Sequence, residues 1–377
     1  MRISSAFDSG SIEVVDIHPE GAIRLNLRRD HVSDPSVEIR QWFHFRLQGA
    51  RCRAVTLCIL NAGAATYPAG WKDYQACASY DRVNWFRVST GFDGTVMTIS
   101  HTPTRDSIYY AYFEPYSWER HLELLGRAED SPLASVDDLG ATPEGRDLNR
   151  VRIGSGAGGK KQIWITARQH PGETMAEWLV EGMIERLLDG NDPASKKLLA
   201  AADFHIVPNM NPDGSVNGNL RVSTTGANLN REWVSPSEER SPEVLRVRNE
   251  MERTGCDFFL DVHGDEIIPY VFAAGCEMLP SSTAAQNAAQ QRYLDALVRA
   301  APDFQLEHGY PAGRYSEDAL KLASKWVGHR FGCISLTLEL PFKDNFNRPD
   351  AVTGWNGARS KVLGGQVLVA LAETIGR

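Results

Sequence analysis

The sequence predicts an α/β fold: a mixed, mostly parallel sheet with helices on both faces, preceded by an antiparallel β-sandwich. Residues 1–115 contain short alternating and aromatic runs between turn residues, with no helical period, a pattern typical of sandwiches and small barrels. Residues 116–377 contain apolar runs of strand length that alternate with helical segments. Apolar strands separated by helices indicate a sheet covered on both faces. We therefore expect two domains, 1–115 and 116–377.

Composition bounds the class of protein. The chain has 377 residues, 42% hydrophobic and 23% charged, which is enough for one large or two ordinary soluble domains. A formal net charge of −8 argues against nucleic-acid binding, because proteins of that class present basic stripes. The first residues lack the layout of a signal peptide, and no apolar run approaches membrane-spanning length. We expect a cytoplasmic protein without nucleic-acid or membrane partners, and the oligomeric state stays open.

Six cysteines are scattered along the chain without a CxxC pair. Most lie inside apolar runs, which favours buried thiols in a reducing compartment over a disulfide framework. A thiolate zinc site is therefore not expected.

The first region contains seven runs that resemble strands. These runs are 12–17, 22–27, 42–47, 54–60, 85–88, 95–99 and 108–113. Their aromatic residues are expected in the core of the sandwich or between the domains, rather than on a ligand-binding surface.

In the second region, a helical pattern at 118–125 is followed by a surface connection at 129–146, which is rich in turn residues. Strand and helix patterns then alternate. The expected strands are 150–153, 162–167, 204–208, 258–262 and 334–340. Four helices are expected. The first ends near residue 188, and the others cover 242–253, 284–300 and 356–375.

A turn between the second of these strands and the helix after it offers two metal ligands. His170 and Glu173 lie three residues apart around Pro171-Gly172, which bends the backbone so that both side chains can face one point. Zinc accepts histidine nitrogen and glutamate oxygen, and a catalytic zinc uses three protein ligands. The spacing alone is weak evidence, because it also occurs at His263 and Glu266.

Polar residues follow other strands as well. Asn209, Asn211 and Asp213 come after one strand, His263 comes after another, and Glu339 lies near the end of the last. Ligands of open α/β sheets bind beyond the carboxyl ends of the strands, so these side chains are expected at one edge. His263 is the preferred third ligand, with Glu266 in reserve. Asp261, together with Asp265 or Glu266, is a candidate to hold the His263 imidazole in one tautomer.

Six motifs in this order resemble those of the zinc metallocarboxypeptidases. They are His170-x-x-Glu173, Asn211-Pro212-Asp213-Gly214, Gly218-Asn219-Leu220-Arg221, the stretch from Gly226 to Trp233, Asp261-Val262-His263-Gly264 and Thr337-Leu338-Glu339-Leu340. The resemblance covers the chain from about Tyr116 to its end. Within the family, the chain is most similar to the cytosolic carboxypeptidase branch, which carries a small β-sandwich ahead of the catalytic domain.

The resemblance implies a role for each matched residue. His170, Glu173 and His263 would hold one zinc ion, and Glu339 would carry the proton during hydrolysis. Arg221 would steady the oxyanion. The pair Asn230 and Arg231 would grip the terminal carboxylate of a peptide or protein substrate, because a planar guanidinium forks onto a carboxylate.

The chain departs from the family pattern at two places. Asn228 replaces the acidic residue that usually stands two before the Asn-Arg pair and supports a zinc histidine, which affects metal affinity. The family's mobile tyrosine has no unambiguous counterpart. Tyr315 is the first choice and Tyr310 the reserve.

The expected specificity pocket lies between Tyr315 and Arg330. This stretch holds Lys321, Lys325 and Arg330, and a cation in a partly buried pocket selects an acidic side chain. The cytosolic carboxypeptidase branch, which the chain resembles, is known for removing glutamates. Arg330 is therefore a candidate substrate-binding residue, and C-terminal Glu or Asp is the expected preference, although solvated helix charges are an equal alternative.

Two other functions compete with a peptidase. One is an amidohydrolase of N-acyl amino acids of the succinylglutamate desuccinylase and aspartoacylase type, which hydrolysis of acyl-aspartate without peptide cleavage would reveal. The other is a catalytically silent peptide-binding module, which a complete ligand set and an intact Glu339 disfavour.

Overall fold

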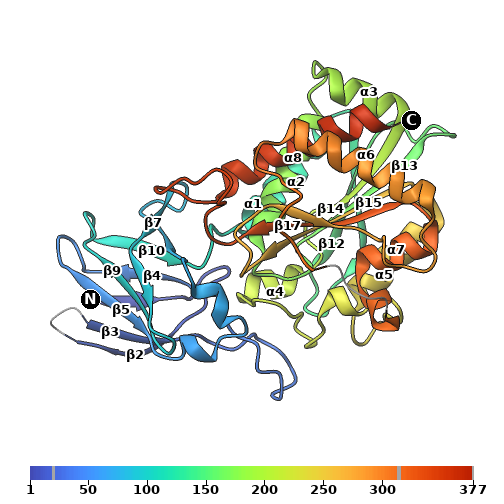
Figure 1. Ribbon diagram of the computed structural model, residues 1–377. Helices are drawn as coiled ribbons and strands as arrows, with labels where there is room; N and C mark the ends of the chain where they lie inside the picture. The colour runs from blue at the N-terminus through green and yellow to red at the C-terminus, as the bar shows by residue number, and fades with distance from the viewer. Residues whose placement is uncertain (19–21, 312–315, 376–377) are drawn as a thin grey trace.

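The computed structural model describes residues 1–18, 22–311 and 316–375. A β-rich N-terminal part lies beside a larger α/β part, shown in blue and in green to red in Figure 1. The predicted boundary between residues 115 and 116 falls between the last strand of the first part and the first helix of the second.

The N-terminal part consists of two five-stranded sheets. One sheet has the order β1-β4-β10-β6-β7 and the other β2-β3-β5-β9-β8. Their strands are β1 (Arg2–Ser4), β2 (Glu13–Ile17), β3 (Ala22–Asn26), β4 (His44–Gln48), β5 (Val55–Ile59), β6 (Ala76–Ser79), β7 (Trp85–Val88), β8 (Thr90–Phe92), β9 (Met97–His101) and β10 (Ser107–Ala111). All pairs are antiparallel except β3 with β5, which run parallel.

The second part is built on a seven-stranded sheet of order β11-β12-β14-β13-β15-β17-β16. Its strands are β11 (Ala134–Ala141), β12 (Asp147–Ile153), β13 (Lys161–Ala167), β14 (Ala202–Val207), β15 (Phe258–Asp265), β16 (Phe272–Ala274) and β17 (Ile334–Pro341). The four central strands are parallel, and the outer pairs are antiparallel. The predicted mixed, mostly parallel sheet is therefore confirmed.

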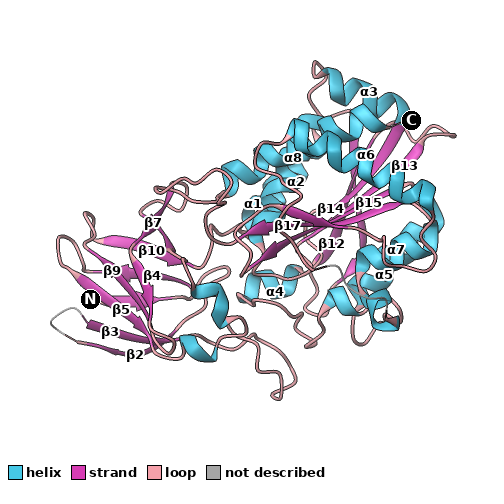
Figure 2. Ribbon diagram, in the orientation of Figure 1, coloured by secondary structure: helices cyan, strands magenta, loops and turns pink. Residues whose placement is uncertain are grey.

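Helices cover both faces of this sheet (Figure 2). They are α1 (Trp118–Glu129), α2 (Thr174–Leu187), α3 (Pro193–Ala201), α4 (Pro212–Asn217), α5 (Pro242–Thr254), α6 (Ala284–Ala300), α7 (Ala323–Phe331) and α8 (Gly357–Thr374). Alternation along β13 explains the layers, because successive strand residues point to opposite faces. Ile163 and Ile165 belong to the core with α2 and α8, whereas Trp164 belongs to the core with α5 and α7.

Helix starts follow from local capping. The Thr283 side chain accepts from the backbone of Gln286, whose own side chain accepts from the Thr283 backbone, a reciprocal cap at the start of α6. Asn356 caps α8 in the simpler way, by accepting from Arg359. These signals explain why both helices begin close to the predicted residues.

The N-terminal part packs on the end of the central sheet where the parallel strands finish. Phe342 directly follows β17, and its ring stacks on Tyr112 at 4.6 Å between centroids. Arg87 of β7 donates to the carbonyl oxygens of Phe342 and Trp355. The sandwich therefore lies against the edge at which ligands of α/β sheets bind.

Some expectations need correction. The stretch 129–146 is not simply a surface connection, because it contains the edge strand β11. No residue of β11 is fully buried, so the strand lacks an apolar pattern that would reveal it.

All six cysteines are free thiols, although Cys52 is exposed. No helix in the described chain is long and apolar enough to cross a membrane.

Candidate active site

Three predicted ligands meet at the carboxyl edge of the sheet. His170 and Glu173 lie in the turn between β13 and α2, and His263 lies in the neighbouring strand β15. Each carboxylate oxygen of Glu173 contacts one histidine. His170 Nδ1 lies 2.7 Å from Oε1, and His263 Nδ1 lies 2.7 Å from Oε2. The two Nδ1 atoms lie 3.2 Å apart, and all three side chains are at most 4% exposed.

The turn is held in shape by a buried arginine. Arg168 has a positive φ of 58°, which a residue with a Cβ adopts rarely. Its guanidinium donates to the carbonyl oxygen of Pro171 at 2.9 Å and to Glu177 of α2 at 2.7 Å. These bonds tie the turn to the helix that follows, and so they fix the backbone between His170 and Glu173.

The outer nitrogens of the two histidines face different partners. Nε2 of His263 lies 2.8 Å from the carboxylate of Asp261, whereas Nε2 of His170 lies 2.9 Å from the amide oxygen of Asn228. The pKa values of the two imidazoles also diverge. Burial lowers the pKa of His170 to about 4. Burial acts in the same sense on His263, but Asp261 and Glu173 raise the pKa of His263 well above its ordinary value.

These three residues fit a divalent metal. Their ligand atoms lie within 4.8 Å of one another, and the cluster is buried. Two imidazole nitrogens and one carboxylate oxygen match the donor types of catalytic zinc sites. The outer nitrogens point away from the cluster and are hydrogen-bonded, as ligand histidines usually are.

Glu339 lies beside this cluster on the adjacent strand. It is the register partner of His263 across β15 and β17, so both side chains project from the same face of the sheet. Glu339 is 6% exposed, and its Oε2 has no hydrogen-bond partner within the described residues. Burial raises the pKa of Glu339 to about 8.

Tyr310, the reserve candidate for the mobile tyrosine, reaches the same carboxylate. Its hydroxyl lies 3.0 Å from Glu339 Oε1 and 3.0 Å from Asp265 Oδ2, while the residue as a whole is 49% exposed. Tyr315, the first choice, lies outside the described residues.

The three predicted substrate-contacting residues Arg221, Asn230 and Arg231 gather around the cluster. Asn230 Nδ2 lies 3.2 Å from Nε2 of His263, and its Oδ1 accepts from the backbone of Ala323 at the start of α7. Arg231 is exposed, and Arg221, Tyr310 and Glu173 lie within electrostatic range of it. The site thus combines a metal-type cluster, a buried carboxylate and two neighbouring arginines.

Two known protein families match most of this chain. The family description "Zinc carboxypeptidase" matches residues 120–353, and "Cytosolic carboxypeptidase N-terminal domain" matches residues 3–113. The chain belongs to the zinc carboxypeptidase family. It is a hydrolase of peptide bonds, and its N-terminal domain is that of the cytosolic carboxypeptidase branch.

Solved structures of zinc carboxypeptidases agree over nearly the whole chain. A metallo-carboxypeptidase from Burkholderia cenocepacia is 56% identical, with 99% of each chain covered and a TM-score of 0.97. One from Pseudomonas aeruginosa, in complex with (2-guanidinoethylmercapto)succinic acid, is 44% identical, with 99% of this chain and 98% of that chain covered and a TM-score of 0.94. Bovine cytosolic carboxypeptidase 3 is 26% identical over 74% of this chain, which spans only 30% of that protein's length.

The basic residues of the expected specificity pocket separate in space. Arg330 of α7 forms a two-pronged ion pair with Glu252 of α5 at the surface, and it makes no described contact with the ligand cluster. Lys321 is exposed and paired with Asp318. Lys325 is 7% exposed, and its ammonium forms no hydrogen bond or ion pair within the part of the chain that the structure describes.

Two residues near Arg221 were not expected from the sequence, Asp30 and Tyr67. The Asp30 carboxylate accepts from the backbone of the Arg221 segment, and Arg221 lies over the ring of Tyr67. Both come from the N-terminal domain, more than 150 residues away in the sequence. No local pattern around either residue signals such a contact.

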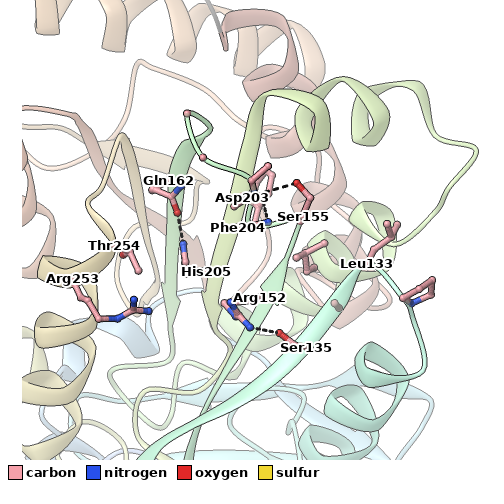
Figure 3. A pocket seen from close by; sticks show the side chains of 18 residues that line it. Leu133, Ser135, Arg152, Ser155, Gln162, Asp203, Phe204, His205, Arg253 and Thr254 are labelled. Atoms are coloured by element: carbon pink, nitrogen blue, oxygen red, sulfur yellow. Dashed lines mark hydrogen bonds between the residues drawn. The ribbon is translucent and has the colours of Figure 1, made fainter.

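A separate cavity of about 440 Å³ opens at the other end of the sheet (Figure 3). It is lined by the glycine-rich loop 154–159 and by residues at the amino ends of β13 and β14. Its basic side chains already have partners, because Arg152 contacts Ser135 and Asp137, and Arg253 contacts Glu250. The cavity therefore offers no unpaired arginine, and the donor cluster at the carboxyl edge remains the candidate active site.

Proposed function

We propose that His170, Glu173 and His263 hold one zinc ion, and that the chain removes single residues from the C-terminus of peptides or proteins. The convergence of two imidazoles on one buried carboxylate carries this proposal. When bound, zinc supplies Lewis-acid chemistry, which polarises a carbonyl group and lowers the pKa of water.

Glu339 is the proposed proton carrier. It accepts a proton from the attacking water and returns it to the leaving amine, work that needs a carboxylate beside the metal ligands. A pKa of about 8, raised by burial, supports this role, because proton exchange at neutral pH is most effective near such a value. Its unpartnered Oε2 is the oxygen available to the water.

Arg231 and Arg221 are proposed to explain why cleavage starts at the C-terminal end of the substrate. Arg231 is proposed to bind the terminal carboxylate, and Arg221 to stabilise the negative charge that develops on the scissile carbonyl oxygen. Asn230 assists Arg231 with the second N–H of its amide, since its oxygen is already held by Ala323. A substrate without a free carboxylate at its end would lose these contacts.

A preference for C-terminal Glu or Asp is proposed to depend on Lys325. Lys325 lies two residues beyond Ala323, which contacts Asn230, and it is buried without an ionic partner in the described chain. A lysine without an ionic partner favours an acidic side chain. Arg330, in contrast, would first have to leave Glu252.

The proposed setting is the cytoplasm, with peptide or protein C-termini as partners and no role in nucleic-acid or membrane binding. The net charge of −8 and the names of the cytosolic relatives support this setting.

Metal analysis combined with peptide digestion tests the function. Purified protein should contain one zinc per chain, lose activity after treatment with a chelator and regain it with zinc. C-terminal analysis of a mixed peptide pool should show residues leaving one at a time. A fully active metal-free protein, or release of amino-terminal residues, would contradict the proposal.

A further inference from the structure

Two segments of the N-terminal domain reach the active site of the neighbouring domain. One contains Asp30, which follows β3, and the other contains Tyr67, which precedes the short helical turn Pro68–Trp71. In Figure 1 the blue domain lies alongside the catalytic domain.

Asp30 organises the backbone of the segment that carries Arg221. Its carboxylate is 6% exposed and accepts three backbone hydrogen bonds, from Leu220 at 2.7 Å, Arg221 at 2.9 Å and Val222 at 3.1 Å. Three successive N–H groups that converge on one carboxylate fix the course of the chain. The direction in which the Arg221 side chain leaves the backbone therefore depends on Asp30.

The same segment touches the turn that holds the metal ligands. The carbonyl oxygen of Leu220 accepts from the backbone of Gly172 at 2.8 Å. A Cβ on Gly172 would come within 3.0 Å of that oxygen, so the two backbones are in close contact. Asp30 is thus connected to the turn between His170 and Glu173 through a single backbone link.

Tyr67 supports the Arg221 side chain from the other side. The Arg221 guanidinium lies 5.4 Å from the centre of the Tyr67 ring, within the range of a cation–π contact. Gln41, which is fully buried, accepts from the Tyr67 backbone N–H at 2.8 Å and donates to its carbonyl oxygen at 3.2 Å. The tyrosine is therefore held in place by its own domain.

The turn after Tyr67 packs directly on the active-site strand end. A Cβ on Gly70 would lie 2.9 Å from the carbonyl oxygen of Glu266, three residues after His263. Only a glycine permits this approach without displacement of one backbone. The contact sets the distance between Tyr67 and the ligand cluster.

The Tyr67 hydroxyl has no hydrogen-bond partner among residues 1–18, 22–311 and 316–375. It lies within electrostatic range of Arg221, Arg231, Glu173 and Glu266. Partial burial raises the pKa of Tyr67 to about 12, so the hydroxyl keeps its proton at neutral pH. A free donor near Arg221 and Arg231 is suited to an oxygen atom of a bound peptide.

We propose that the N-terminal domain completes the substrate-binding site, with Tyr67 donating a hydrogen bond to a backbone oxygen of the peptide and Asp30 positioning Arg221. This inference rests on the proposed carboxypeptidase function. It assigns the sandwich a direct part in substrate binding, in addition to any role in packing.

Tyr67→Phe tests the hydroxyl, because this change keeps the ring under Arg221. Loss of one neutral hydrogen bond should raise KM about 3- to 10-fold with little change in kcat. Calorimetry should show the same loss of affinity when a peptide binds to the Glu339→Gln protein with and without Tyr67→Phe. Tyr80→Phe, which alters a sandwich tyrosine bonded to Thr104, should leave both quantities unchanged. Equal KM values for wild type and Tyr67→Phe would overturn this part of the inference.

A double-mutant cycle tests Asp30. Asp30→Asn replaces one acceptor oxygen with a donor that faces backbone N–H groups, and it should lower kcat/KM about 10- to 100-fold. In the Arg221→Ala background the same change should cost less than about twofold, because Asp30 acts through Arg221. Asp34→Asn, at an exposed carboxylate of the same loop, is the matched control. Equal costs in both backgrounds would reduce Asp30 to a purely structural residue.

The outcomes distinguish this inference from the function on which it rests. A wild-type protein that binds zinc but cleaves no peptide would contradict the proposed function. A wild-type protein that cleaves peptides, with Tyr67→Phe and Asp30→Asn fully active, would contradict only the part assigned to the N-terminal domain. If Asp30→Asn does not fold, the Tyr67→Phe binding measurement decides by itself.

Discussion

The amide oxygen of Asn228 lies 2.9 Å from Nε2 of His170, whereas Nε2 of His263 faces the carboxylate of Asp261. The two imidazoles share Glu173 on their inner side. Burial and the nearby Arg221 lower the pKa of His170, whereas Asp261 acts with Glu173 to raise the pKa of His263 against burial. A neutral amide makes His170 a weaker base than an aspartate would.

Asn228→Asp should therefore tighten zinc binding. A carboxylate would polarise the His170 imidazole as Asp261 polarises His263, and we expect about a 10-fold gain in affinity. Competition with a chromophoric chelator measures this gain. Asn191→Asp adds the same charge beyond the far end of α2 and should have no effect. Unchanged or weaker binding in Asn228→Asp would show that the amide does not limit the site.

Glu339→Gln should separate catalysis from metal binding. The glutamine cannot accept a proton, so kcat should fall about 10²- to 10⁴-fold. Zinc content should stay the same, because Glu339 is not among the three converging donors. Glu307→Gln, at an exposed position, serves as the control in turnover assays and metal analysis. Retained turnover, or loss of zinc together with activity, would assign Glu339 another role.

Substitution of Lys325 should change selectivity. Lys325→Ala should lower kcat/KM for peptides ending in Glu about 10- to 100-fold, since a charge-assisted contact is lost. Peptides ending in Phe should change less than about threefold. Arg330→Ala should leave both substrates unaffected, because its guanidinium is held by Glu252. An equal loss for both peptides in Lys325→Ala would point to a folding defect in place of a specificity contact.

The ionisation of Asp30 should make the free energy of unfolding depend on pH. Burial raises the pKa of Asp30 from 3.8 to about 6, with Arg28 and Arg221 as the charged groups that face it. Between these values the folded state binds more protons than the unfolded state, so the Asp30 contribution to the free energy of unfolding falls as pH rises. The fall amounts to about 3 kcal/mol.

Asp30→Asn cannot titrate and isolates this contribution. Urea unfolding at pH values of about 4 and 7 should show that the difference in unfolding free energy between wild type and Asp30→Asn shifts against the wild type at the higher pH. A difference independent of pH would mean that Asp30 has an ordinary pKa in the folded protein.

Much of the candidate site was predictable, because the candidate ligands follow strands whose apolar character is evident in the sequence. His170 and Glu173 come after β13, His263 lies in β15, and Glu339 lies in β17. Parallel strands end at one edge of the sheet, so the convergence of these side chains follows from the order of elements. The structure confirms that Asp261 contacts His263.

The remainder depends on contacts between segments far apart in the chain. Asp30 meets Leu220 across 190 residues, and nothing in either segment encodes that distance. Arg330 illustrates the reverse case, because its charge suggested a pocket, whereas an ion pair with Glu252 holds it at the surface. Strand β11 is not predictable from the sequence, because its residues are partly exposed and lack an alternating pattern.

One comparison tests the central claim most directly: digestion of a single peptide with a free C-terminus and of the same peptide with a C-terminal amide, followed over time by mass spectrometry. Capture of the terminal carboxylate by Arg231 beside the zinc site predicts stepwise loss of single residues from the free peptide, and an amidated peptide that stays intact. Equal cleavage of both peptides, or cleavage at internal bonds, would contradict the account.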